Sequence, residues 1–208
     1  MSVQRRIAWN LKGRSAVASI DPPTRHRILQ SNAMLSCAHR SLLAVLETLI
    51  SVEYVGGLSG PLKKPELFVC LIVRILQIAP SPSVVLAMLQ QDVHKYLRVA
   101  ALFIIRLIGN AAMMQEALRI GWMDYRKIRV YCSDAERGDA MREGKSAESN
   151  EGENRLPYDC LEAHGAPSYG IMCVDEITDC LFRTCEEQKN TGGGGGHTWL
   201  GLQFPPIL

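Results

Sequence analysis

Two long apolar runs constrain the fold of this 208-residue chain more than any other feature. Residues 68–78 and residues 97–108 are apolar almost throughout, although each run contains arginine. Both are well short of the roughly 18 to 20 residues that cross a bilayer, so no membrane span is predicted. Residues 68–78 are apolar nearly all round, and a helix of this kind is surrounded by other helices. The run therefore predicts a central element.

A buried strand is the alternative for residues 68–78, because the run is rich in valine and isoleucine. Three features favour a helix: Pro65 with Glu66 in the expected first turn, the length of the run, and its end at Ala79-Pro80.

Helical signals extend over most of the first 130 residues. Asp21 and Ser81 each precede proline, the pattern of an N-cap followed by the first helical turn. Between residues 28 and 50 apolar residues recur at intervals of three and four positions, which predicts two helices separated near Ser36. The second is expected to end at Val55-Gly56-Gly57 with a glycine cap. Further helices are predicted over residues 84–90, from Asp92 as N-cap to about 108, from 111 to about 130, and from Ile171 onward. The predicted fold is all-α, a single helical bundle-like domain.

Charge is distributed unevenly along the chain. Residues 1–132 carry 17 Lys/Arg against 7 Asp/Glu, whereas residues 133–208 carry 6 against 14. A basic body of this kind favours acidic partners or nucleic acid.

Composition predicts how the domain is organised. Residues 133–155 hold almost no large apolar side chain and cannot offset the entropy of ordering, which predicts disorder. Five consecutive glycines at 192–196 predict a flexible tether to an apolar tail that docks on the bundle or on a partner. The predicted parts are a basic N-terminal segment (1–19), a helical core (20–132), a flexible insertion (133–157), a C-terminal helical part of the same domain (158–190), and a glycine linker with an apolar tail (191–208).

Motifs of common enzyme classes are absent from the sequence. It contains no GxSxG, Walker P-loop or HExxH. Cys70 paired with His94 or His26 is the alternative, a thiol nucleophile, but Cys70 lies in the most apolar run, where a thiolate is disfavoured. We therefore predict a protein that is not an enzyme, with no cofactor and no small-molecule substrate.

The seven cysteines include no CxxC pair, and the N-terminus lacks the apolar core of a secretory signal. These features predict free thiols in a protein that stays inside the cell. A zinc site could be drawn from one cluster, but its spacing fits no ribbon or finger, so buried thiols are the favoured interpretation and no metal is predicted. The cluster consists of Cys160, His164, Cys173, Cys180 and Cys185.

Arg98 and Arg106 recur eight residues apart, which places both guanidinium groups on one face of a helix. One interpretation is a docking stripe for an acidic partner or for a partner's backbone carbonyls. The other is a pair of internal salt bridges, for example to Glu66, Asp92 or Asp124. The residue types leave both open.

Residues 124–129 combine three cations with an aromatic ring, a combination that can grip phosphate or an acidic peptide. Tyr125, Arg126, Lys127 and Arg129 are therefore candidate partner-binding residues. The alternative is a solvated helix end whose cations complement the helix dipole. No known RNA-binding motif predicts sequence-specific recognition, so any RNA contact would be electrostatic.

The chain also resembles the pre-mRNA-splicing factor 38 family, over residues 20–131 and again near residues 171–182. The resemblance rests on seven short elements in the same order and at similar spacing. They are Val55-Gly56-Gly57; Lys64-Pro65 with Phe68, Cys70 and Leu71; Leu76-Gln77-Ile78 with Pro80; Lys95-Tyr96 with Arg98; Arg106-Leu107 with Gly109; Asp124-Tyr125-Arg126-Lys127-Ile128; and Val174-Asp175-Glu176.

The resemblance implies an all-helical nuclear protein of the spliceosome, associated with the tri-snRNP and the precatalytic complex and needed for activation. Family members act as scaffolds for other splicing proteins, among them a zinc-finger protein and a partner that binds as long helices. A basic helical module that contacts RNA without reading its sequence is the alternative function. Gly56, Gly57, Pro65, Asp175 and Glu176 fall on family positions that are expected to maintain the fold.

Overall fold

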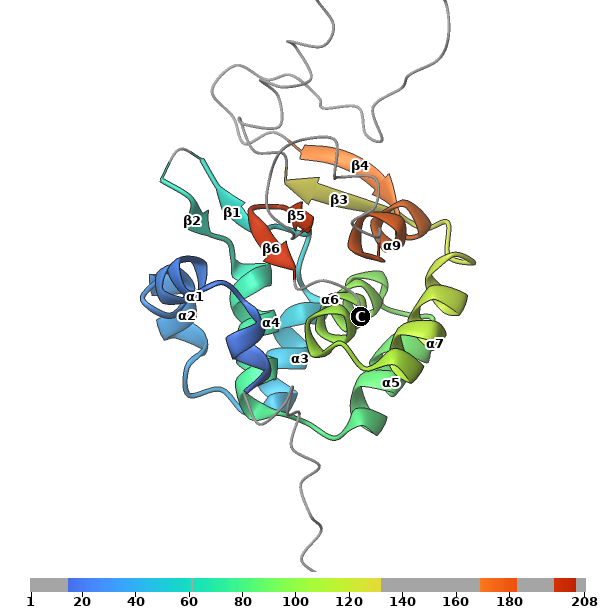
Figure 1. Ribbon diagram of the computed structural model, residues 1–208, viewed down its shortest axis with the longest axis horizontal. Helices are drawn as coiled ribbons and strands as arrows, with labels where there is room; N and C mark the ends of the chain where they lie inside the picture. Colours follow the sequence, from blue (N-terminus) through green and yellow to red (C-terminus); the bar gives the residue numbers. More distant parts are fainter. Residues whose placement is uncertain (1–14, 61, 132–168, 183–196, 205–208) are drawn as a thin grey trace, which may run out of the picture.

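The computed structural model describes residues 15–60, 62–131, 169–182 and 197–204. Residues 1–14, the predicted insertion at 133–157, residues 158–168 and the glycine linker at 191–196 lie outside the described residues. Helices make up most of the described part, and short strand pairs lie against them (Figure 1). The helices are η1 (Ala16–Ser19), α1 (Pro22–Leu29), α2 (Asn32–Cys37), α3 (Leu42–Ile50), α4 (Leu67–Ile78), α5 (Pro82–Gln90), α6 (Lys95–Ile108), α7 (Ala111–Gly121) and α9 (Val174–Phe182).

The prediction of an all-α fold is correct for the helical body but misses three two-stranded antiparallel sheets within the described residues. One pairs β1 (Leu58–Ser59) with β2 (Lys64–Pro65), and Pro65 therefore lies in a strand and not in the first turn of α4. The second pairs β3 (Lys127–Tyr131) with β4 (Tyr169–Cys173), and the third pairs β5 (His197–Trp199) with β6 (Leu202–Phe204).

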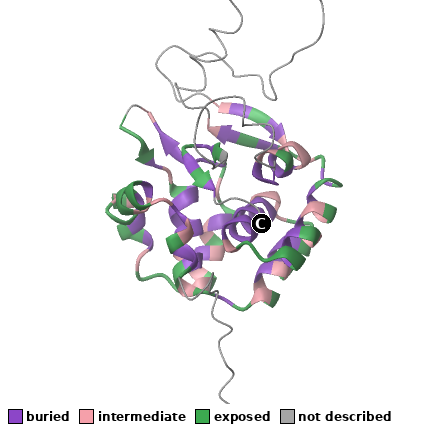
Figure 2. Ribbon diagram, in the orientation of Figure 1, coloured by how far each residue is buried: buried purple, intermediate pink, exposed green. Residues whose placement is uncertain are grey.

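The central position predicted for residues 68–78 is confirmed. This run forms α4, and α4 and α6 contribute the longest stretches of buried side chains (Figure 2). Phe68 of α4 meets Phe103 of α6 edge to face, with ring centroids 5.4 Å apart. The helix ends at Ala79 in a left-handed conformation before Pro80, because proline cannot continue it.

Two predicted helix ends are wrong in instructive ways. The helix from residue 111 ends at Gly121 and not near residue 130, because Ile128 and Val130 alternate as buried residues with exposed Lys127 and Arg129. A period of two belongs to a strand. Residues 169–173 likewise form β4, and helix α9 begins only at Val174.

The segment from residue 22 to residue 57 also departs from the prediction. It forms three helices with breaks at Gln30 and near Arg40, since Ser31 and Ser41 cap new helices by accepting hydrogen bonds from Met34 N and Ala44 N. Helix α3 ends at Ile50, so Gly56 and Gly57 are not its cap. The predicted N-cap at Asp21 is confirmed, because its carboxylate accepts a hydrogen bond from Thr24 N. His94, and not Asp92, is the N-cap of α6.

The apolar tail docks on the helices of its own chain. Trp199 is buried and stacks on Phe103 with centroids 5.4 Å apart, and Phe204 lies 6.0 Å from the same ring. The backbone N–H of Leu58 donates to the carbonyl of Leu200 over 3.0 Å. A Cβ atom added at Gly57 would lie 2.0 Å from that carbonyl oxygen. The tail can pack this closely only because Gly57 has no side chain.

Candidate functional site

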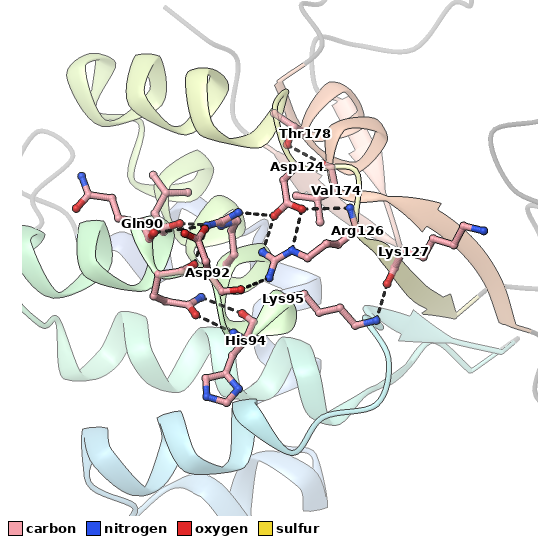
Figure 3. Close-up of polar contacts among 12 residues, drawn as sticks. Gln90, Asp92, His94, Lys95, Asp124, Arg126, Lys127, Val174 and Thr178 are labelled. Carbon is pink, nitrogen blue, oxygen red and sulfur yellow. Dashed lines mark hydrogen bonds and ion pairs between the residues drawn. The ribbon is translucent and has the colours of Figure 1, made fainter.

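The guanidinium group of Arg98 lies in a buried polar network near the start of α6. Figure 3 shows Asp92, Asp124 and Arg126, which belong to the same network. Arg98 is 6% exposed. Its Nη1 donates to Asp124 Oδ2 over 2.5 Å, and its Nε donates to the carbonyl of Leu89 over 2.9 Å. Its Nη2 donates to the carbonyl of Gln91 over 2.7 Å and to the carboxylate of Asp92. The guanidinium thus ties the end of α5 and the turn at Asp92 to the loop that follows α7.

Asp124 is shared between two arginines. Besides Arg98, it accepts hydrogen bonds from Arg126 Nε over 2.8 Å and Arg126 Nη2 over 2.6 Å. Burial alone raises the pKa of Asp124, but the hydrogen bonds from Arg126 and Arg98 outweigh burial and lower it below its ordinary value. Arg126 Nη1 also donates to the carbonyl of Asp92, which closes the network between the two loops.

The same loop anchors the N-terminus of α9. Val174 N donates to the carbonyl of Arg126 over 3.2 Å, and Asp175 N donates to the carbonyl of Asp124 over 3.1 Å. Glu176 accepts a hydrogen bond from the backbone N–H of Cys173 over 2.6 Å, the carboxylate half of a capping box. Backbone N–H groups that a helix leaves unpaired at its start are thus bound by residues 124–126 and by Glu176.

Arg106 is even more deeply buried, at 1% exposed. Its Nε donates to the carbonyl of Leu181 in α9 over 2.7 Å, and its guanidinium lies 5.5 Å from the centre of the Phe204 ring. The predicted surface stripe of Arg98 and Arg106 is therefore not exposed. Both side chains stabilise the domain from within, as the alternative of internal contacts predicts, and Asp92 and Asp124 are the carboxylates that Arg98 binds.

The other candidate residues lie at the surface on and before β3. Tyr125 is 67% exposed, and Lys127 and Arg129 are exposed on alternate positions of the strand. Arg126 is half-buried because it binds Asp124. The prediction of a helix end here is wrong, since these residues form a loop and a strand. The structure does not gather all six candidate side chains into one site.

The metal ligands and the thiol nucleophile considered from the sequence were sought among the described residues. Among them, no group of three or more His, Cys, Asp or Glu side chains could hold a metal ion. Of the cysteine cluster considered above, only Cys173 and Cys180 lie in the described part of the chain. Burial raises the pKa of the Cys70 thiol to about 11, which opposes formation of a thiolate. No helix in the described part of the chain is long and apolar enough to span a membrane.

Comparison with known families identifies the chain. The model of the PRP38 family matches residues 10–151. The chain belongs to the PRP38 family. Pre-mRNA-splicing factor 38 of Arabidopsis thaliana is 29% identical over 129 residues, which cover 62% of this chain and 36% of that protein. Its Schizosaccharomyces pombe counterpart is 32% identical over 94 residues, which cover 45% of this chain and 44% of that protein.

The PRP38 relatives are longer than the region they share with this chain. Pre-mRNA-splicing factor 38A of Xenopus laevis is 28% identical over 130 residues, which cover 62% of this chain but only 42% of that protein. A similar solved structure is the crystal structure of the Snu23-Prp38-MFAP1(217-258) complex of Chaetomium thermophilum. It is 20% identical, covers 97% of this chain and 81% of that chain, and has a TM-score of 0.65, which shows a shared fold.

The geometry explains several residues on which the resemblance to the PRP38 family rests. The element at residues 124–128 and the element at residues 174–176 are about fifty positions apart in the sequence, yet they meet at the start of α9. Gly57 admits the tail, and its carbonyl accepts a hydrogen bond from Glu66 N over 2.9 Å. The hydrogen bond between Gly57 and Glu66 joins the residue before β1 to the residue after β2.

The sequence did not single out Tyr54 and Tyr169. Tyr54 lies in the loop after α3 and Tyr169 in β4, and their ring centroids are 5.0 Å apart. Neither belongs to a recognised motif, and Tyr169 follows the polar segment that separates β3 from β4. Only the pairing of the two strands reveals this aromatic cluster.

Proposed function

We propose that the chain is a non-enzymatic protein–protein scaffold of the spliceosome, required for pre-mRNA splicing and for spliceosome activation. The observation that carries this proposal is the family match over residues 10–151, together with relatives that are pre-mRNA-splicing factors. The proposed location is the nucleus, in the tri-snRNP and the precatalytic complex. No cofactor and no small-molecule substrate enters the proposed function.

The proposed partners are other splicing proteins. The similar solved structure contains Prp38 together with Snu23 and residues 217–258 of MFAP1. By analogy we propose that this chain binds a zinc-finger splicing protein and a splicing protein that docks as long helices. A domain whose described helices pack around one core presents fixed loops to such partners, which reduces the entropy lost on binding.

Exposed apolar side chains favour one surface for a protein partner. Val93 is 80% exposed and Met123 is 77% exposed, and Tyr125 lies two residues further on. The two loops that carry them are tied together by the hydrogen bond from Arg126 to the carbonyl of Asp92. We name this surface, formed by Val93, Met123 and Tyr125, the loop patch. Exposed apolar side chains that form a contiguous patch mark protein–protein interaction sites.

The buried arginines give the loop patch its rigidity. Arg98 and Arg126 hold Asp92 and Asp124 at fixed positions, so the backbone on both sides of the patch is bound to α6. Arg98 therefore acts in partner binding through the fold, whereas Val93, Met123 and Tyr125 make the contact.

The proposal is tested by affinity purification of the tagged full chain from nuclear extract at low salt, followed by mass spectrometry. We expect tri-snRNP proteins in the wild-type sample and at least tenfold less in the double variant Met123→Asp, Tyr125→Asp. Leu43→Asp is the matched control, because Leu43 is also 67% exposed but lies on α3. Absence of splicing proteins from the wild-type sample contradicts the scaffold function. Equal loss in the control contradicts the placement of the contact on the loop patch.

A further inference from the structure

The outer face of the β3–β4 sheet carries an aromatic and basic surface that the scaffold function does not use. The register places Lys127 opposite Cys173, Arg129 opposite Ile171, and Tyr131 opposite Tyr169. Side chains on one face of a strand alternate with those on the other. Ile128, Val130 and Met172 are buried against the helices, so the three cross-strand pairs lie on the opposite, outward face.

Three tyrosine rings meet at one end of this face. The ring centroids of Tyr131 and Tyr169 are 5.9 Å apart, and the ring of Tyr54 lies 5.0 Å from Tyr169 and 6.4 Å from Tyr131. The hydroxyl of Tyr54 donates to Glu66 Oε2 over 2.9 Å, which fixes the position of the Tyr54 ring. All three rings are half-buried and so combine a rigid position with partial access to solvent.

Cations line the same face. The guanidinium of Arg129 lies 4.8 Å from the centre of the Tyr169 ring, and Lys127 is exposed one pair along the sheet. Lys95 approaches from α6, where its ammonium donates to the carbonyl of Lys127 over 2.6 Å. We name the surface formed by Tyr54, Lys127, Arg129, Tyr131 and Tyr169 the tyrosine face.

No carboxylate in the described part of the chain forms an ion pair with Lys127 or Arg129. Within the described residues, ion pairs form at Arg98, Arg119 and Arg126 but not at these two. Two carboxylates that contact residues of this sheet region have other partners: Glu66 accepts hydrogen bonds from Tyr54 and Ser59, and Glu176 accepts one from Cys173 N. A ligand that brings negative charge can therefore pair with Lys127 and Arg129 without breaking an ion pair among the described residues.

We propose that the tyrosine face binds single-stranded RNA. Unpaired bases stack on aromatic rings and on the plane of an arginine guanidinium, while the backbone phosphates pair with cations. An acidic peptide would pair with Lys127 and Arg129 but would have no need of three adjacent rings, so the aromatic cluster favours RNA. The bases of a duplex are already stacked on one another, and duplex RNA is expected to bind less well. This inference concerns a different surface from the loop patch and does not depend on the scaffold function.

The test is fluorescence anisotropy of the full chain with a labelled 12-nucleotide oligouridylate at several salt concentrations. We expect binding that weakens steeply with salt, and at least tenfold weaker binding by Lys127→Ala, Arg129→Ala. Each lost phosphate contact should reduce the slope of log K against log salt by about 0.7. The matched control is Lys63→Ala, Lys64→Ala, which removes the same charge from two exposed lysines near β2 and should change the affinity less than twofold.

The stacking contribution is tested separately at Tyr169. Tyr169→Phe keeps the ring and should bind as the wild type does, whereas Tyr169→Leu should bind about tenfold more weakly. Circular dichroism and thermal unfolding establish that each variant is folded, and Tyr131→Leu at the facing position of β3 decides the outcome should the Tyr169→Leu variant unfold.

Several outcomes overturn the proposal. One is the absence of RNA binding by the wild type at 100 mM salt. Another is an equal loss of affinity in the two double variants, because RNA would then be attracted by the overall positive charge and not by a defined site. Tighter binding of duplex RNA than of the single strand excludes stacking. A labelled peptide of alternating glutamate and tyrosine that binds more tightly than the RNA, with the same dependence on Lys127 and Arg129, assigns the face to a protein partner.

Discussion

Asp124 connects three parts of the domain: α6, the loop before β3, and the start of α9. It is 5% exposed, binds both Arg98 and Arg126, and its backbone carbonyl accepts from the start of α9. Removing one partner from a buried ion pair leaves the other charge uncompensated, which is more destabilising than the loss of an exposed pair. Asp124 is thus a position where a small change in chemistry should have a large effect on the fold.

Asp124→Asn should lower the free energy of unfolding at pH 7 by about 3 kcal/mol, measured by urea denaturation. The matched control is Glu116→Gln, which removes the carboxylate of the exposed pair with Arg119 and should change stability little.

The pH dependence follows from the lowered pKa of Asp124. Its stabilising effect is present above the unfolded-state pKa of about 3.9 and is lost as the pH falls through the lower folded-state pKa. The difference in stability between wild type and Asp124→Asn should therefore shrink as the pH falls below about 4. A difference that stays constant down to pH 2 would show that the charge of Asp124 is not what stabilises the domain.

At the scale of the element, α9 depends on contacts made before its first turn. Its first N–H groups bind the carbonyls of residues 124 and 126, and Glu176 binds the N–H of Cys173. The helix is nine residues long, too short to be stable alone in water. Its stability comes from these end contacts and from the apolar residues that it buries against α6 and α7.

Glu176→Ala should destabilise the domain by about 1 kcal/mol, the usual contribution of a helix cap. Hydrogen exchange measured by mass spectrometry should be faster in α9 of the alanine variant than in α9 of the wild type, while exchange in α4 stays the same in both. Glu176→Gln is the control, because glutamine can accept the same hydrogen bond. Identical exchange in the alanine variant and the wild type would mean that the cap is dispensable.

At the scale of the whole molecule, residues 197–204 of the tail pack into the core formed by the helices. Trp199 and Phe204 pack on Phe103 at the centre of the helices, and Arg106 joins Phe204 to α9. The bundle is therefore completed by residues from near its C-terminus. Close approach at Gly57 permits this packing, because Gly57 lies against Leu200. Gly121 likewise lets α7 approach α9, since a Cβ atom at Gly121 would lie 2.2 Å from Thr178 Oγ1.

Gly57→Ala should displace the tail, because the added Cβ atom would occupy the position of the Leu200 carbonyl. We expect a loss of about 2 to 3 kcal/mol in unfolding free energy and a red shift of tryptophan emission as Trp199 becomes exposed. Gly60→Ala is the control, since no atom lies within 4 Å of the added methyl and only the positive φ opposes it. Its emission should stay unchanged, and an unshifted spectrum in Gly57→Ala would contradict the role of Gly57.

The sequence by itself determined the helical body, the central position of α4, the N-cap at Asp21 and the family resemblance. Each of these is written in residues a few positions apart, where side-chain spacing and capping act directly. Only the tertiary structure decided that residues 127–131 form a strand, that Arg98 binds Asp124, and that Arg106 binds the carbonyl of Leu181. These contacts join positions 26 to 75 residues apart. A buried arginine and an exposed one have the same side chain, and what distinguishes them is the set of distant residues that the fold brings around each.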